Sequence, residues 1–153
     1  MYSLISRIVD GESEYNLENV KFSNIKSSSN SILKFEYNNI KINNIEVENI
    51  SCTGDNGDSS FILFNSDDNN NNFTISNSII KNSISNGPFI KITGNANSFK
   101  LENTTIYNIT SYGPILDNTS KKVINYLIFN LLCILIIFNI FVFYNYLYFK
   151  IYI

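Results

Sequence analysis

Two polar insertions of this 153-residue chain contain four aspartates that could support catalysis or bind an ion. The insertions are CTGDNGDSS at 52–60 and SDDNNNN at 66–72, and residues 55–72 include no lysine or arginine. Clustered carboxylates can bind calcium, or can act as acid and base in attack on a polysaccharide. The candidate calcium or glycan contacts are therefore Asp55, Asp58, Asp67 and Asp68.

The rest of the composition supplies few partners for such chemistry. The chain has no histidine, which removes histidine triads and most zinc sites, and its single arginine, Arg7, lies well before the acidic insertions. Aspartate, asparagine, glycine and serine also form ordinary solvated loops. We therefore expect a non-catalytic protein with no cofactor and no metal centre.

Charge and cysteine content exclude two further classes. Eleven basic residues against 13 acidic ones give a net charge of −2, so the chain lacks the basic surface of a nucleic-acid-binding protein. The two cysteines, Cys52 and Cys133, lie in dissimilar regions and form neither a disulfide framework nor a CxxC metal motif.

The elements that position these residues are predicted by an internal repeat. Four segments, which begin at Tyr15, Ile40, Phe73 and Phe99, share the pattern apolar-x-apolar-x-Asn-x-x-apolar-x-Asn and follow one another at steps of 25, 33 and 26 residues. The first asparagines are Asn19, Asn44, Asn77 and Asn103, and the second are Asn24, Asn49, Asn82 and Asn108. The two prolines, Pro88 and Pro114, both stand in Gly-Pro-apolar-apolar motifs 26 residues apart, which supports the same step independently.

Each repeat reads as β structure. Apolar and polar residues alternate within the motif, and a second short apolar run follows it, at residues 31–35, 61–64, 89–92 and 115–117. A unit of this size cannot bury its own apolar face, so the units must stack into one continuous core. The aspartates fall in the longest unit, which has 33 residues.

This pattern resembles the right-handed parallel β-helix of pectate-lyase-like proteins, over about residues 1–120. The abundance of asparagine, isoleucine, lysine, tyrosine and phenylalanine resembles β-helix proteins of AT-rich lower eukaryotes. The resemblance implies about four coils, with the eight repeat asparagines stacked in two ladders whose amides point inward and satisfy turn backbone groups. It also implies an alternative function, a fragment of a polysaccharide lyase or glycoside hydrolase relative with its site in the acidic coil. The structural alternative is a leucine-rich-repeat solenoid, whose units also end on asparagine.

Five Asn-x-Ser/Thr sequons occur, a number that the composition alone would produce. Three of them, at Asn49, Asn103 and Asn108, coincide with ladder positions, where an inward amide could not carry a glycan. Asn72 and Asn118 remain as candidate glycosylation sites.

The C-terminal region changes character after Lys122. Residues 123–149 carry no charge, glycine or proline and exceed the length of about 20 residues that a membrane span needs. We predict a transmembrane helix over 123–149 with a short tail at 150–153; a mistranslated intron and buried strands are the alternatives. Together these expectations describe a fragment of a larger all-β solenoid in a single-pass membrane protein, with an extracellular β-helix that serves as a structural stalk or contacts glycans and neighbouring surface proteins.

Overall fold

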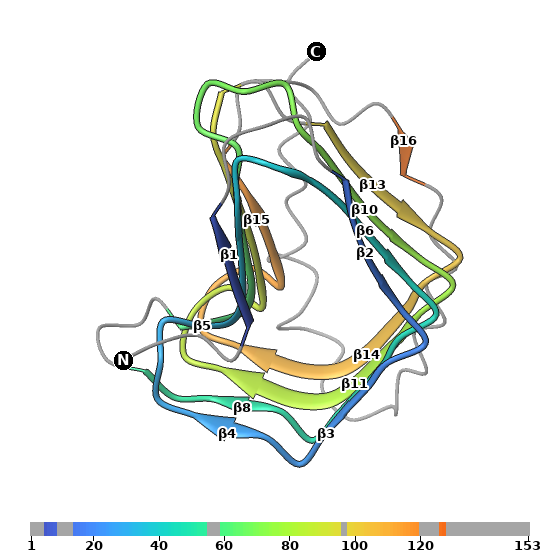
Figure 1. Cartoon of the computed structure of the whole chain (residues 1–153). Helices are drawn as coiled ribbons and strands as arrows, with labels where there is room; N and C mark the ends of the chain where they lie inside the picture. The colour runs from blue at the N-terminus through green and yellow to red at the C-terminus, as the bar shows by residue number, and fades with distance from the viewer. Residues whose placement is uncertain (1–4, 9–13, 55–58, 96–97, 120–125, 128–153) are drawn as a thin grey trace.

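The computed structural model describes residues 5–8, 14–54, 59–95, 98–119 and 126–127. Every regular element in these ranges is a strand, and every strand pair is parallel. The strands form three sheets, here named A, B and C, which make the three sides of a roughly triangular coil (Figure 1). The prediction of an all-β parallel β-helix of about four coils is confirmed.

Each complete coil contributes to all three sheets, and in sheet C the contribution of each of the first two coils is divided into two short strands. Sheet A contains β1 (Ile5–Ile8), β5 (Ser31–Glu36), β9 (Ser60–Asn65), β12 (Ile90–Thr93) and β15 (Leu116–Asn118). Sheet B contains β2 (Glu14–Glu18), β6 (Asn39–Asn43), β10 (Asn72–Ser76), β13 (Ser98–Glu102) and β16 (Tyr126–Leu127). Sheet C contains β3 (Lys21–Ser23), β4 (Lys26–Ser27), β7 (Glu46–Glu48), β8 (Ser51–Cys52), β11 (Ile79–Ser85) and β14 (Thr105–Ser111). The predicted second apolar runs are the strands of sheet A.

The core is a set of columns in which like residues lie above one another. In sheet B, Ile42 pairs in register with Ile75, which pairs with Leu101, and all three are buried. The ring of Phe73 packs between those of Phe64 and Phe99, with centroid distances of 4.9 Å to Phe64 and 5.3 Å to Phe99. Because the side chains of a strand alternate between its faces, the period-two pattern of the sequence places these apolar residues inside.

The corners between strands depend on left-handed backbone conformations. All eight repeat asparagines have φ between 42° and 57°, a region that asparagine tolerates better than most residues. At the corner from sheet A to sheet B, Gly94 has φ 114°, and a Cβ built on it would lie 2.1 Å from Ser66 Oγ. The asparagine repeat therefore marks the positions of the turns in each coil.

The described strands decide between the two solenoid classes. A leucine-rich repeat pairs one strand with a helical or irregular segment per unit, whereas each complete coil here contributes strands to three sheets. The leucine-rich-repeat alternative is therefore wrong.

The predicted transmembrane segment falls largely outside the described residues. β16 lies within 123–149 and pairs with β13, where Lys100 is in register with Tyr126. Residues 123–125 and 128–149 are outside the described ranges. In the part of the chain that the structure describes, no helix has the length and hydropathy to cross a membrane.

Candidate functional site

The asparagine ladders lie on the outside of the solenoid. All eight repeat asparagines are exposed, so the expectation that their amides point inward is wrong. The physical reason is the turn itself: each asparagine occupies a left-handed position at a bend of the backbone, and the apolar residues on either side fill the interior. The ladder hydrogen bonds are nonetheless present, because stacked bends bring neighbouring amides together.

Each ladder has the same direction and the same interruption. The amide Nδ2 of one asparagine donates to Oδ1 of the asparagine one coil earlier, over 2.7 Å from Asn44 to Asn19 and 2.7 Å from Asn108 to Asn82. Asn49 and Asn103 donate in the same way, to Asn24 and Asn77. Between the second and third repeats the amides donate to residues next to the ladder asparagines. Asn77 donates to Asn43 Oδ1 at 2.9 Å, and Asn82 donates to Glu48 Oε1 at 3.5 Å.

Two buried serines bridge the coils where the ladders are interrupted. Ser78 Oγ accepts the backbone N–H of Ile45 at 3.2 Å, and Ser83 Oγ accepts that of Ile50 at 3.1 Å. Each hydroxyl also donates within its own coil, to Ser76 O and Lys81 O respectively. These serines follow Asn77 and Asn82 directly, where the other coils have valine, isoleucine or threonine. Side-chain bonds inside the solenoid therefore replace the asparagine contacts outside it.

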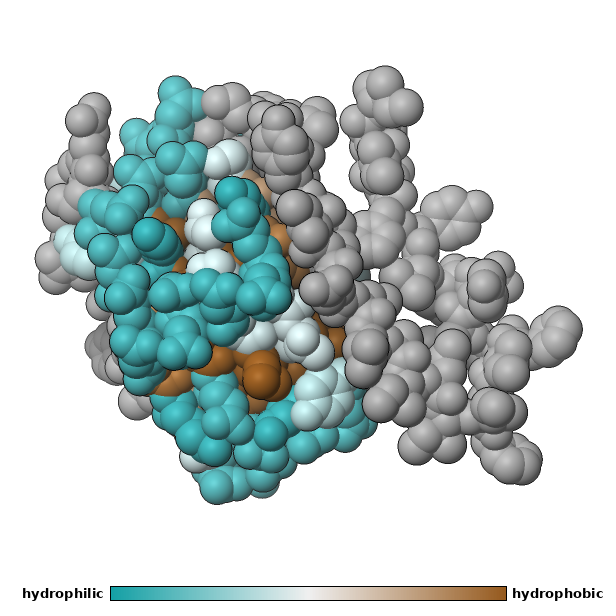
Figure 2. Space-filling view, turned by 90° about the vertical axis from the view of Figure 1, so that its right-hand side faces the viewer, coloured by the Kyte–Doolittle hydropathy of each residue, from teal (hydrophilic) through white to brown (hydrophobic). Residues whose placement is uncertain are grey.

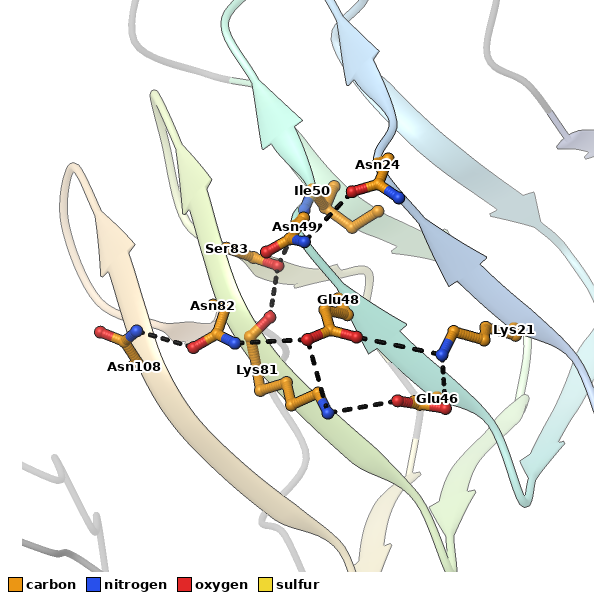
Figure 3. A network of polar contacts seen from close by, with 10 residues as sticks. All are labelled: Lys21, Asn24, Glu46, Glu48, Asn49, Ile50, Lys81, Asn82, Ser83 and Asn108. Atoms are coloured by element: carbon orange, nitrogen blue, oxygen red, sulfur yellow. Dashed lines mark hydrogen bonds and ion pairs between the residues drawn. The ribbon is translucent and has the colours of Figure 1, made fainter.

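Four charged side chains form a cluster on the outer face of sheet C (Figure 3). Lys21 Nζ lies 3.0 Å from Glu46 Oε2, and Lys81 Nζ lies 3.2 Å from Glu46 Oε1 and 3.5 Å from Glu48 Oε1. The ammonium of Lys21, and after it that of Lys81, lowers the pKa of Glu46 below its ordinary 4.5, and Glu46 raises the pKa of Lys81. Because the lysines and glutamates satisfy one another across three coils, this face has the character of a structural network.

The candidate acidic site is only partly described. Asp67 and Asp68 are exposed at the corner after β9, and Asp68 Oδ1 accepts a hydrogen bond from Asn95 Nδ2 on the next coil. Asp67 has φ 53° and its N–H donates to Asn65 Oδ1 at 3.1 Å, which are the features of a turn residue. Asp55 and Asp58 lie outside the described residues. Among the residues described, no three acidic, cysteine or histidine side chains gather as a metal site would require.

The two candidate glycosylation sites differ in orientation. Asn72, at the start of β10, is exposed and accepts a hydrogen bond from Ser98 Oγ. Asn118 is half-buried and pairs in register with Ile92, whose side chain is fully buried in the core column. The sequence pattern could not assign these faces, because both residues lie outside the repeat motif.

A shallow groove crosses three coils at the corner that leaves sheet C. It encloses about 320 Å³ and is lined by Thr53, Ile84, Ser85, Asn86, Thr110, Ser111 and Tyr112. Tyr112 is 77% exposed and Ile84 is 46% exposed, although most isoleucines in the described chain are buried. Hydroxyl and amide groups therefore lie beside an exposed aromatic ring, and no lining residue is charged.

Sequence reasoning missed this groove and a third pair of asparagines. The groove residues follow the second asparagine of the last three repeats. Ile84 pairs in register with Thr110, two residues before Tyr112, and this proximity becomes visible only in the structure. Asn38 and Asn71 are buried at the corner before sheet B, and the Oδ1 atom of each has no hydrogen-bond partner. Their signal in the sequence was only that each precedes another asparagine.

The outer face of sheet B offers no comparable feature. In Figure 2 this face is mostly hydrophilic, with hydrophobic side chains visible in small areas between polar ones. Its described ion pair, Lys100 with Glu102, is satisfied at 2.6 Å. A second open groove of about 330 Å³ runs along the first asparagine ladder and includes Lys21 and Glu46 in its lining. The groove beside Tyr112 differs from it in having no charged lining residue and in presenting an exposed aromatic ring.

In the comparison with known proteins, no protein family, curated protein or solved structure matches the chain. The pectate-lyase-like resemblance therefore rests on the repeat and the parallel coils alone.

Proposed function

We propose that this chain is a non-catalytic, membrane-anchored surface protein whose β-helix is a stiff stalk that contacts glycans. The observation that carries the proposal is the groove beside Tyr112, together with a core filled by stacked apolar columns. A filled solenoid is a rigid support, and the anchor would be the part of the apolar segment 123–149 that follows β16.

The groove has the chemistry of a weak carbohydrate site. The exposed ring of Tyr112 offers a flat apolar surface to a sugar, while Thr110 offers a hydroxyl group and Asn86 an amide oxygen for hydrogen bonds. The amide nitrogen of Asn86 already donates to Gly54 O at 2.9 Å. Because no lining residue is charged, a neutral glycan fits better than a uronate polymer. Openness and small size favour contact over the enclosure that catalysis requires.

Binding of the full chain in detergent to an array of immobilised neutral and uronate glycans tests the contact. We expect Tyr112→Ala to reduce binding to neutral glycans at least fivefold. Tyr107→Ala is the matched control, because Tyr107 is also exposed on sheet C but does not line the groove. Equal loss in both variants, or binding to uronates alone, would contradict the proposal.

The enzymatic alternative and the anchor have separate tests. Calcium-dependent cleavage of pectate, lost in Asp67→Asn, would replace the stalk by a lyase; asparagine retains the left-handed backbone of Asp67 and removes only the charge. For the anchor, we expect the full chain to stay with membranes in alkaline carbonate and a chain that ends at residue 122 to be released. Release of the full chain would contradict the anchor.

A further inference from the structure

We infer that three ladder asparagines, Asn49, Asn103 and Asn108, are acceptors for N-linked glycans. Each stands in an Asn-x-Ser/Thr sequon, with Ser51, Thr105 and Thr110 as the hydroxyl residues. The inference rests on the proposed surface location, because this modification takes place on secreted and membrane chains.

Exposure is the first observation that supports these acceptors. All three asparagines are exposed, and their side chains leave the solenoid at outward bends. Figure 3 shows Asn49 and Asn108 in one row with Asn24 and Asn82 on the outer side of sheet C. Asn118, whose register places it in the core column with Ile92, is the poorer acceptor.

Spacing is the second observation. Neighbouring coils are about 4.8 Å apart, too close for two sugars on adjacent rungs of one ladder. In the ladder of Asn24, Asn49, Asn82 and Asn108, only Asn49 and Asn108 carry a sequon, and one coil without a sequon separates them. In the other ladder only Asn103 carries one. The sequons thus leave a free rung beside every acceptor.

The modification is compatible with the ladder hydrogen bonds. The donor would be an oligosaccharide on a lipid pyrophosphate: the bond from Nδ2 to sugar C1 forms as the bond from C1 to the pyrophosphate oxygen breaks. The lipid pyrophosphate leaves with the electron pair, and one amide proton passes to the transferase or to water. One N–H remains on Nδ2, so Asn108 can still donate to Asn82 Oδ1.

The test expresses the full chain behind a cleavable secretory leader in cultured animal cells and maps glycans by mass spectrometry before and after enzymatic deglycosylation. We expect glycans on Asn49, Asn103 and Asn108. Thr110→Ala should remove the glycan from Asn108 alone, whereas Thr110→Ser should retain it, because serine also completes the sequon. Thr110 is exposed, so neither variant disturbs the core.

Two outcomes would overturn the inference. One is the absence of sugar from all three ladder positions of the untreated chain while that chain still reaches the cell surface, with or without sugar on Asn72 or Asn118. The surface function would then stand, and the proposed acceptors would not. The other is retention of the Asn108 glycan in Thr110→Ala. A chain that never reaches the surface, yet carries the three glycans, would contradict the proposed function and support the acceptors.

Discussion

At the residue scale, each ladder asparagine contributes through both its backbone conformation and its side-chain hydrogen bond. Its backbone adopts φ near 50°, and its side-chain amide makes a hydrogen bond to a neighbouring coil. The two contributions can be separated by substitution. Glycine adopts the left-handed backbone but has no side-chain amide, whereas alanine lacks the amide and is also strained in that backbone conformation.

Asn77 is the position that separates them best. It donates to Asn43 and accepts from Asn103. We expect Asn77→Gly to lower the free energy of unfolding by about 1 kcal/mol through the lost side-chain bonds. Asn77→Ala should cost roughly a further 1 kcal/mol for the left-handed backbone. Chemical denaturation measures both, with the loop variant Asn69→Ala as control; equal stability of the glycine and alanine variants would contradict the backbone contribution.

The ion cluster on sheet C predicts a dependence on pH. The pKa of Glu46 is lowered in the folded chain, so its ion pairs stabilise the fold above the unfolded value of 4.5 and are lost as pH falls through the lower folded pKa. Wild type should therefore melt above Glu46→Gln near neutral pH, and the two melting temperatures should converge in acid. Thermal melts at a series of pH values check this. A difference that stays constant into acid would show that Glu46 acts by packing alone.

At the residue scale Cys52 is chemically quiet. Its side chain is fully buried, and burial raises the pKa of the thiol to about 12. In register it lies between Ser27 and Ser85, so it occupies one position of a column of small residues.

At the element scale, the sheets depend on columns that cross from one sheet to another. Phe73 of β10 contacts the ring of Phe64 in β9 as well as that of Phe99 in β13. The aromatic column therefore ties sheet B to sheet A, in addition to the backbone ladders within each sheet.

Replacement of one ring in this column should be costly. We expect Phe73→Leu to lower the free energy of unfolding by about 1–2 kcal/mol, since two ring contacts are lost in a close-packed interior. Phe35→Leu serves as the control, because Phe35 is also buried but makes none of the ring contacts found among the described residues. Denaturation midpoints that fall equally in both variants would mean that volume alone matters.

At the scale of the whole molecule, stability should vary along the solenoid axis. A coil in the middle has neighbours on both sides, whereas an end coil has one described neighbour. Ile80 and Ile106 make this visible, because they share one column and pair in register, yet Ile80 is fully buried and Ile106 is half-buried.

The same substitution in the two coils gives a matched comparison. We expect Ile80→Ala to cost about 3 kcal/mol and Ile106→Ala less than half of that, because the cavity left in the central coil is enclosed. Denaturation of both variants measures the difference. Equal losses would indicate that further structure covers the last described coil.

The repeat in the sequence predicts both the coil and its register. Phe22, Val47, Ile80 and Ile106 form one column, as their repeat positions predict, because every coil must present the same alternation to a shared core. The repeat does not predict which way the asparagines face, because it shows only that the positions are equivalent. The left-handed bend, seen in the folded chain, sets the direction of the side chain. The groove and the serine bridges could not be predicted from the repeat either. They join residues of different coils, and the proximity of these residues depends on where a 33-residue coil places its extra residues.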